Sequence, residues 1–373
     1  MNERKTYEIA EENRIFSPSL VYYKDYIVEN IKTILELAGG AERLWPHIKT
    51  HKCAEVIELI QGFGVNRFKA ATIAEAELLG TCGAAEVILA YPLLGPNVER
   101  FMKLQKAFPD TRFWAIQEDF GCIETIAAAS AEAGLTTNLM LDVNCGMDRT
   151  GVSMDQAAEL YRKCSGLAGI HIGGLHCYDG HHHAPSKADR TADAAETAEQ
   201  ILKLRGEIMA GGLDAPIIVV GGTPSSVCYG AYPDFFVSPG TAFLNDYGYQ
   251  QAIPDIPATP AGIVLGRVVS HPAEGLFTID VGVKAIATDP APIRGVIAGY
   301  EDAVDPVLQN EEHWVFRMRE GTDRARPALG DVVYVIPSHI CPTSALYPEA
   351  IVVEKGHVTG TWKIAARNRV LTI

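Results

Sequence analysis

Long apolar runs are missing from this chain of 373 residues. No segment stays apolar over the roughly 18 residues that a membrane-spanning helix needs. Residues 1–5 mix charges and are followed by polar sequence, so they lack the apolar core of a secretory signal peptide. We therefore expect a cytoplasmic protein.

Positive charge is also in deficit. The chain has 32 Lys and Arg against 46 Asp and Glu, a formal net charge of -14, and its pI is near 5.3. Binding to a nucleic-acid backbone or to an anionic membrane surface requires concentrated positive potential, which this composition does not favour. Small-molecule substrates fit the composition better.

The cysteines show no regular spacing. We therefore expect reduced, mostly buried thiols and no disulfide framework. Except for Cys341, we interpret them as packing residues. The eight cysteines are Cys53, Cys82, Cys122, Cys145, Cys164, Cys177, Cys228 and Cys341.

Internal repeats and low-complexity segments are absent as well. Hydrophobic residues make up 47% of the chain and charged residues 21%, the balance of an ordinary globular protein. Because the length exceeds what one hydrophobic core usually covers, we expect two domains.

Residues 17–253 alternate short β-rich runs with helical stretches. Several runs are almost wholly apolar, as strands buried on both faces of a parallel sheet are. This rhythm predicts a (β/α)8 barrel, with a doubly wound open sheet as the alternative. The predicted strands are 19–21, 44–49, 67–70, 86–89, 112–116, 138–143, 170–175, 217–221 and 235–237, and the predicted helices include 24–38, 72–80, 121–133, 154–165 and 186–210.

The pattern changes after residue 253. Residues 254–261 are rich in Pro and Ala, and alternating runs joined by Gly, Pro and Asp follow. This pattern predicts a mainly antiparallel β domain of residues 254–373, with the N-terminal residues 1–16 added to it. Its predicted strands are 262–270, 276–281, 314–318, 332–336 and 350–355.

Lys49 is the last residue of the predicted strand 44–49, an apolar run of the predicted barrel. A barrel strand would deliver its side chain to the carboxyl rim, where active sites lie. There it can form a Schiff base with a cofactor aldehyde, and positive charge on Lys52 and on His47 or His51 would lower its pKa. The alternative is a solvated basic turn, and Lys52 is the second candidate lysine.

Two loops that follow predicted strands have the composition of phosphate sites. Residues 221–226 read GGTPSS and residues 238–241 read SPGT. Such loops present backbone N–H groups and hydroxyls to phosphate oxygens, and the last two loops of a (β/α)8 barrel are the usual phosphate position. Each loop taken alone also fits an ordinary turn.

Residues 142–151, DVNCGMDRTG, begin at the end of the predicted strand 138–143. The guanidinium of Arg149 could hold an anionic oxygen through its fixed donors. A surface arginine beside a glycine turn is the alternative.

Residues 176–183 contain adjacent histidines. Because adjacent side chains point in different directions, these histidines are not expected to share one metal ion. We expect at most one of His181, His182 and His183 to act as an acid or a base, with His181 as the candidate. Tyr178 is expected to pack against the cofactor.

His339 and Cys341 are two residues apart near the end of the chain. In an extended segment residues i and i+2 face the same side, so both could bind one cation, with zinc the natural choice for mixed nitrogen and sulfur ligands. Two ligands leave coordination positions open for water and substrate, as in a catalytic site. The alternative is a buried thiol beside a hydrogen-bonded histidine.

Taken in order, these motifs resemble the D-threonine aldolase and D-serine dehydratase family, which belongs to the alanine-racemase-like pyridoxal-phosphate enzymes. The resemblance covers nearly the whole chain. It implies a pyridoxal-phosphate barrel followed by a β domain that supplies the metal ligands. The motifs are residues 46–52, 144–151, 221–225, 311–313 and 337–343.

The resemblance also implies roles for single residues. Lys49 would carry the cofactor, His47 would lie beside it, and Arg149 and Tyr178 would flank its ring. Trp45 stands where many relatives have arginine, which removes one expected arginine contact. The other implied roles are a phosphate cradle of Gly222, Thr223, Gly240 and Thr241, catalytic residues His181 and His313, and metal ligands His339 and Cys341.

Two reactions of β-hydroxy-D-amino acids fit the resemblance. A dehydratase would yield a 2-oxo acid and ammonia, whereas an aldolase would release glycine and an aldehyde. His339 and Cys341 form the His-x-Cys pattern that resembles the dehydratases, since aldolases of the family often carry His-x-Asp, and we favour the dehydratase.

Other features implied by the resemblance are a divalent metal, with zinc ahead of manganese and magnesium, and a homodimer. Two further alternatives are a racemase and a non-catalytic pyridoxal-phosphate-binding protein of cofactor homeostasis. Proteins of the latter kind generally consist of the barrel alone, and the long β domain argues against that role.

Overall fold

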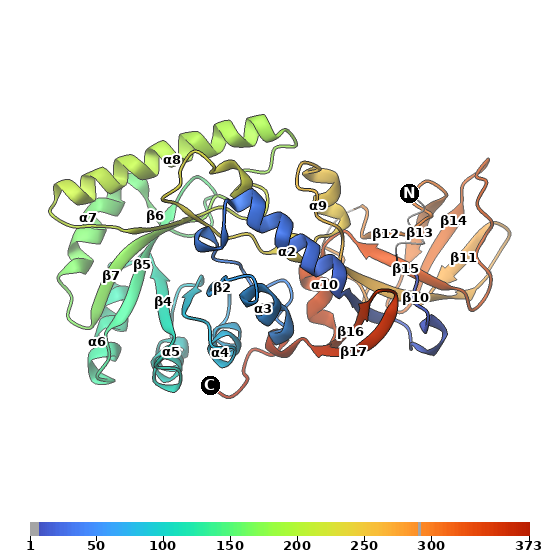
Figure 1. The fold of residues 1–373 in the computed structure, drawn as a ribbon, viewed down its shortest axis with the longest axis horizontal. Coiled ribbons are helices and arrows are strands. Elements are labelled where there is room, and N and C mark those ends of the chain that lie inside the picture. The colour runs from blue at the N-terminus through green and yellow to red at the C-terminus, as the bar shows by residue number, and fades with distance from the viewer. Residues whose placement is uncertain (1–6, 290–291) are drawn as a thin grey trace. The chain divides into compact units, whose positions relative to one another are not determined.

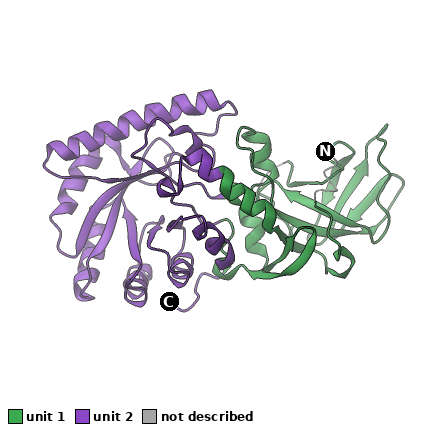
Figure 2. Cartoon of the chain, viewed as in Figure 1, with its two compact units in different colours: residues 1–33, 50–53, 241–367 green, residues 34–49, 54–240, 368–373 purple. Residues whose placement is uncertain are grey.

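The computed structural model describes residues 7–289 and 292–373. The chain forms two compact units, which Figure 2 colours separately. The unit that we call the sheet unit contains the described residues of 1–33, 50–53 and 241–367, and the barrel unit contains residues 34–49, 54–240 and 368–373. Residues 1–6 of the predicted β domain lie outside the described residues.

The barrel unit is built on parallel strands in the order β2-β3-β4-β5-β7-β8-β9, with the short β6 beside β5. Residues 44–47 bridge to Val237 on one side and to Lys69 on the other, which closes the sheet. Figure 1 shows helices such as α4, α5 and α6 placed around these strands. The predicted parallel barrel is confirmed.

The elements of the barrel unit are η2 (Ala41–Arg43), α3 (Ala54–Gln61), β2 (Arg67–Ala70), α4 (Ile73–Thr81), β3 (Glu86–Leu89), α5 (Pro96–Ala107), β4 (Arg112–Gln117), α6 (Phe120–Glu132), β5 (Thr137–Asn144), β6 (Val152–Ser153), α7 (Met154–Ser165), β7 (Ile170–Cys177), α8 (Lys187–Ala210), β8 (Ile217–Val220), η3 (Ser226–Cys228) and β9 (Phe236–Val237). Helix α2 (Lys24–Ala38) is divided between the two units.

The predicted strand at 44–49 is only partly correct. Trp45 N donates to Val237 O and His47 N donates to Pro239 O, both at 2.9 Å, but the segment is not a regular strand and turns at residue 48. Pro46 has no N–H to give to a sheet ladder, which explains the irregularity. Lys49 therefore lies in the turn that follows this segment.

The interior of the barrel is filled by side chains. Trp45 and Trp114 are its largest members, and both are buried. A filled interior leaves only the rim for a ligand. The cluster consists of Trp45, Ile88, Trp114, Ile116, Met140 and Val219.

The sheet unit is mainly antiparallel, as predicted. Its strand order is β13-β14-β11-β10-β1-β16-β17, and β15 pairs with both β10 and β12. Its elements are η1 (Glu12–Arg14), β1 (Ser19–Tyr23), η4 (Thr241–Phe243), α9 (Tyr247–Ala252), β10 (Gly262–Ser270), β11 (Leu276–Ile279), β12 (Gly295–Ile297), β13 (Val304–Gln309), β14 (Trp314–Met318), β15 (Val332–Pro337), α10 (Ile340–Leu346), β16 (Glu349–Glu354), β17 (His357–Lys363) and η5 (Ala365–Arg367).

The strand predicted at 19–21 exists but does not belong to the barrel. As part of β1 it pairs antiparallel with β10 and parallel with β16. The chain therefore enters the barrel later than the predicted residue 17. None of the helices within the described ranges combines the length and the apolar character that crossing a bilayer demands.

Candidate active site

A pocket of about 460 Å³ opens in the barrel unit beside the carboxyl ends of β2, β3 and β7. It has the size of a site for a small molecule or cofactor. Four residues singled out from the sequence line it, and two that the sequence left unassigned join them. These six lining residues are His47, Lys49, Lys69, Arg149, His176 and Tyr178, and Tyr91 and Thr150 also line the pocket.

Lys49 is half-buried in the turn after the 44–47 segment. Its backbone N–H donates to Nδ1 of the buried His47 at 3.4 Å. This bond fixes the His47 ring against the turn that carries Lys49. An amine and an imidazole therefore reach the pocket from one short segment, as residues 46–52 predicted.

His51 does not supply the positive charge that the sequence suggested. Its side chain is buried, and burial lowers its pKa to about 3, so the imidazole is neutral near pH 7. Its Nδ1 accepts the N–H of Cys53 at 3.3 Å. Lys52, the second candidate lysine, belongs with His51 to the sheet unit, and its backbone has a positive φ of 51°.

Tyr178 is in contact with two cationic side chains. The guanidinium carbon of Arg149 lies 4.8 Å from the centre of its ring, and Nζ of Lys69 lies 5.1 Å from it. Cations over an aromatic face are attracted by its negative potential. Arg149 is exposed at the mouth of the pocket, whereas Lys69 is buried.

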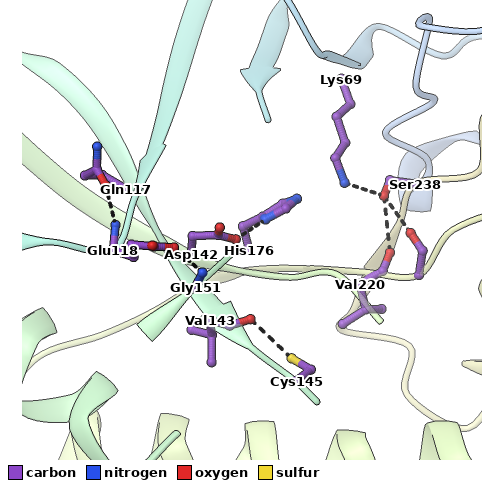
Figure 3. Close-up of polar contacts among 11 residues, drawn as sticks. Lys69, Gln117, Glu118, Asp142, Val143, Cys145, Gly151, His176, Val220 and Ser238 are labelled. Atoms are coloured by element: carbon purple, nitrogen blue, oxygen red, sulfur yellow. Dashed lines mark hydrogen bonds and ion pairs between the residues drawn. The ribbon is translucent and has the colours of Figure 1, made fainter. Parts of the chain in front are cut away.

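Asp142 and His176 form a buried pair that the sequence left without a role. They lie near the ends of the neighbouring strands β5 and β7, and Oδ1 of Asp142 is 2.6 Å from Nδ1 of His176 (Figure 3). Burial opposes the charge of Asp142, but the hydrogen bond and the charge of His176 bring its pKa below the ordinary value. Asp142 is therefore an ionised carboxylate that accepts a hydrogen bond from the Nδ1–H of His176.

The second ring nitrogen of His176, Nε2, is available to interact with a bound molecule. Burial, followed by the charge of Lys69, lowers the pKa of His176, so its ring is neutral near pH 7. Since Asp142 holds Nδ1–H, Nε2 has the lone pair, and it is buried without a partner among the described residues. Because His176 lines the pocket, this nitrogen can accept a hydrogen bond or a proton from a bound molecule.

Lys69 is a second lysine of the pocket that the sequence did not single out. It lies in β2 and is 3% exposed, and its Nζ donates to Oγ of Ser238 at 3.0 Å (Figure 3). Burial, and then the charge of Lys49, lowers its pKa to about 7. The sequence signal for such a residue is a lysine near the carboxyl end of a predicted parallel strand.

The two predicted phosphate loops lie together. Gly240 N donates to Oγ1 of Thr223 at 3.3 Å, and Oγ of Ser238 donates to Gly221 O at 2.8 Å. Within the first loop, Gly222 N donates to Ser225 Oγ at 3.2 Å. The loops therefore gather N–H donors and hydroxyls, which is the chemistry of a phosphate site.

Thr241, the fourth residue of the predicted cradle, belongs to the sheet unit. Its hydroxyl is 3.2 Å from Sγ of Cys341, which is also in that unit. The structure therefore pairs Thr241 with the thiol proposed from the sequence as a metal ligand. Its role in phosphate binding stays a prediction.

Gly240→Ala is expected to destabilise the protein by about 1–3 kcal/mol, since overpacking costs that much. A Cβ at this position would lie 2.9 Å from the backbone oxygen of His47, which has no rotamer by which to move away. Thermal unfolding of the variant should show a lower Tm. Gly206→Ala in α8 is the matched control, because its Cβ would meet nothing within 4 Å and alanine favours the helix. An unchanged Tm for Gly240→Ala would contradict the close packing of the loop.

Two of the adjacent histidines have their rings close together, at an interplanar angle of 44°. The ring centres of His181 and His182 are 4.1 Å apart, and Nε2 of His182 is 2.8 Å from Oγ1 of Thr197 in α8. Contrary to the expectation of divergent side chains, the two rings lie together. Burial, followed by the charge of His182, lowers the pKa of the half-buried His181. A catalytic role for His181 stays a prediction, and so does one for His313, which is exposed in the β13–β14 turn.

His339 and Cys341 come together in a geometry that differs from the predicted one. His339 is the N-cap residue of α10 and Cys341 lies in the first helical turn, so the two are not in an extended segment. They still interact, and their hydrogen bond opposes the effect of burial on each group. It raises the pKa of His339 to about 9 and lowers the pKa of the Cys341 thiol.

The surroundings of Cys341 favour a thiolate. The hydroxyls of Thr50 and Thr241 lie 3.1 and 3.2 Å from its Sγ. Nδ1 of His339 also contacts the carboxylate of Asp289. Imidazole and thiolate are suitable ligands for zinc, and the residue types fit a divalent metal with positions left for other ligands. Among residues 7–289 and 292–373, no group of at least three His, Cys, Asp or Glu side chains is arranged to hold a metal ion.

Comparisons with known proteins agree with these features. The sequence matches the family described as alanine racemase, N-terminal domain, over residues 24–248, and the family described as putative serine dehydratase domain over residues 261–353. The D-threonine aldolase of Arthrobacter sp is 25% identical to this chain over 360 residues, which is 95% of this chain and 93% of the aldolase.

Two further relatives extend the comparison. The D-threo-3-hydroxyaspartate dehydratase of Delftia sp. (strain HT23) is 23% identical over 368 residues, which is 93% of this chain and 96% of the dehydratase. The crystal structure of D-threonine aldolase from Filomicrobium marinum is similar with a TM-score of 0.88 and 25% identity, and covers 96% of this chain and 98% of that one. An aldolase and a dehydratase are thus both similar to this chain along nearly its whole length.

Proposed function

This chain belongs to the alanine racemase N-terminal domain family, and from that premise we propose that it is a pyridoxal-phosphate- and metal-dependent lyase that acts on β-hydroxy-D-amino acids. Relatives named as aldolases and as a dehydratase support a lyase. The observation that carries the proposal is the pocket at the barrel rim, where Lys49, Arg149 and Tyr178 lie together.

The pocket fits pyridoxal phosphate. It offers an amine for the aldehyde, cations for anionic groups, and an unpartnered imidazole nitrogen. When bound, the cofactor supplies an electron sink for a substrate carbanion. Lys49 would hold the cofactor covalently and Tyr178 would pack beside its ring. Gly222, Thr223 and Gly240 would hold its phosphate.

The charged residues of the pocket would orient the substrate and move protons. Arg149 is exposed at the mouth, where its guanidinium can hold a carboxylate through two hydrogen bonds. His176 presents Nε2 as an acceptor, and the carboxylate of Asp142 fixes the tautomer that makes it one. The amine of Lys49 would take the α-proton of the substrate.

His339 and Cys341 would hold the divalent metal, whose chemistry there is that of a Lewis acid toward a substrate oxygen. We favour the dehydratase reaction because the thiol of Cys341 is paired with His339, the His-x-Cys pattern of the dehydratase side of the family. Zinc as the metal, a homodimer and a cytoplasmic location stay predictions.

The aldolase reaction is the second candidate. The first relative described above, the enzyme of Arthrobacter sp, is named as a D-threonine aldolase, and the similarity covers 95% of this chain and 93% of the aldolase. A racemase and a non-catalytic pyridoxal-phosphate-binding protein are further alternatives. The antiparallel sheet unit with His339 and Cys341 argues against a binding protein that consists of a barrel alone.

A product assay tests the proposal. The purified protein, loaded with pyridoxal phosphate and zinc or manganese, is incubated with D-serine, D-threonine and D-threo-3-hydroxyaspartate. We expect a 2-oxo acid and ammonia in equal amounts. Glycine with an aldehyde would identify the aldolase instead. Inversion at Cα alone, or no turnover of any substrate by protein that binds the cofactor, would contradict a lyase.

Asp142→Asn is expected to lower kcat/KM about 10- to 100-fold, the usual effect of removing a carboxylate that orients a functional histidine. The carboxylate raises the pKa of His176, so its loss should move the acidic limb of the pH–rate profile to lower pH. Asp155→Asn, the same change at an exposed position of α7, is the control. An unchanged profile in Asp142→Asn would remove His176 from the proton transfers.

A further inference from the structure

Lys69 is a buried amine of the pocket to which the proposed reaction gives no task. Its side chain is 3% exposed, and among the described residues it forms no ion pair. A buried ammonium without a counter-ion is unfavourable, so such groups are normally paired. The position of Lys69 therefore calls for an anionic partner.

The single hydrogen bond described for Nζ of Lys69 places it at the meeting point of the two phosphate loops. Nζ donates to Oγ of Ser238 at 3.0 Å, and that hydroxyl donates to Gly221 O at 2.8 Å. One of these two residues belongs to each loop. Figure 3 shows Lys69 pointing from its strand toward Ser238.

Neither of the nearby carboxylates forms an ion pair with Lys69 among the described residues, although Oδ2 of Asp142 has no hydrogen-bond partner there. Asp142 accepts from His176 at 2.6 Å, and Asp179 accepts from Ser225 at 2.8 Å and from Tyr229 at 2.6 Å. Both acids act on Lys69 only through their charge, which is opposed by two cations. An ammonium at this point thus has donors left for a ligand.

We propose that Lys69 binds the phosphate of the cofactor non-covalently, as the cation of the phosphate site. The inference rests on the proposed function, because it takes pyridoxal phosphate as the ligand. It separates the two lysines of the pocket: Lys49 reacts with the aldehyde, whereas Lys69 recognises the anion. A dianion at the loops would stabilise the ammonium form of Lys69 and draw a proton onto it.

The test uses pyridoxine 5′-phosphate, which has no aldehyde and cannot react with Lys49. Its dissociation constant is measured by calorimetry for the full chain and for Lys69→Met, beside that of unphosphorylated pyridoxine. A charge-assisted hydrogen bond contributes enough for a loss of about 10- to 100-fold on substitution. We expect that loss for the phosphate ester and an unchanged affinity for pyridoxine. Lys103→Met on the exposed face of α5 is the control.

The affinity should also depend on pH in a specific way. Burial lowers the pKa of Lys69 to about 7, so the free protein loses the ammonium as pH rises above that value. Affinity for the phosphate ester should fall above pH 7 in the unmodified chain, by up to about tenfold per pH unit. Lys69→Met should lack this fall. The other charged or titratable groups that face Lys69, and that remain in the variant, are Lys49, Asp142, Arg149, His176, Tyr178 and Asp179.

Two outcomes would overturn the assignment. They are an unchanged affinity of Lys69→Met for the phosphate ester, or an equal loss for pyridoxine. Should Lys69→Met fail to fold, Ser238→Ala gives the second test, because it removes the acceptor that orients Nζ and should weaken only the phosphate ester. Failure of the proposed function looks different: the unmodified chain would then bind neither pyridoxal phosphate nor its analogues.

Discussion

Lys49→Ala is expected to abolish lyase activity, with kcat lowered by a factor on the order of 10⁴ or more, as when a covalent catalyst is removed. Lys49 is the half-buried amine at the barrel rim, whereas Lys69, the other amine that lines the pocket, is only 3% exposed. Activity is measured by 2-oxo acid and glycine release with saturating pyridoxal phosphate. Folding is checked by thermal unfolding.

Lys52→Asn is the matched control for Lys49. It removes the second candidate lysine, and asparagine tolerates the positive φ of 51° at this position. We expect this variant to keep most of its activity. If Lys52→Asn were inactive and Lys49→Ala active, Lys52 would be the reacting lysine and the pocket described above would lose its central residue.

Cys341→Ala is expected to lower kcat by about 10²–10³-fold or more, on the scale of losing a Lewis acid that contributes several kcal/mol. The thiol is held by His339 and by the hydroxyls of Thr50 and Thr241, an arrangement that favours the thiolate that a metal binds. Bound metal, measured by elemental analysis after dialysis, should fall with the activity. Chelation of the unmodified protein should produce the same loss.

Two variants sharpen the test of the metal ligands. Cys82→Ala changes another half-buried thiol, at the end of α4, and should leave metal content and activity unchanged. Cys341→Asp should retain part of the bound metal, because a carboxylate also binds zinc. Full activity in Cys341→Ala, or in the chelated protein, would contradict a metal held by His339 and Cys341.

The positions of helices in the barrel could be predicted closely because nearby capping residues mark where the helices begin. Thr72 accepts the N–H of Glu75 and caps α4, and Ser186 caps α8 through Asp189. Each predicted helix start therefore lies within one residue of the observed one. The strands were predictable from their apolar runs, as β10 and β14 show.

The sheet to which a strand belongs was less predictable, because an apolar run does not identify the strands with which it pairs. Residues 19–23, SLVYY, would suit a buried strand of either sheet, and only long-range pairing with β10 and β16 assigns them. The extended conformation predicted for residues 339–341 was wrong for a different reason. A helix of seven residues, α10, begins directly after His339, and its Pro and Thr content resembles that of a loop.

The candidate site was predictable where a motif marks it. Lys49, Arg149 and Tyr178 each follow an apolar run and are surrounded by polar residues, and the structure brings them to one pocket. Lys69 and the Asp142–His176 pair lie inside the strands, where an alternating pattern predicts packing. Their roles depend on which strand ends face one another across the barrel, and a linear sequence does not contain that information.

The central claim is that Lys49 carries pyridoxal phosphate, and borohydride reduction tests it most directly. The purified protein is incubated with the cofactor, its visible absorption is recorded, and it is reduced, digested and mapped by mass spectrometry. We expect a visible band that reduction removes and a pyridoxyl group on the peptide that contains Lys49, with none on Lys52 or Lys69. Label on another lysine, or no label in protein that is shown to be folded, would contradict the account.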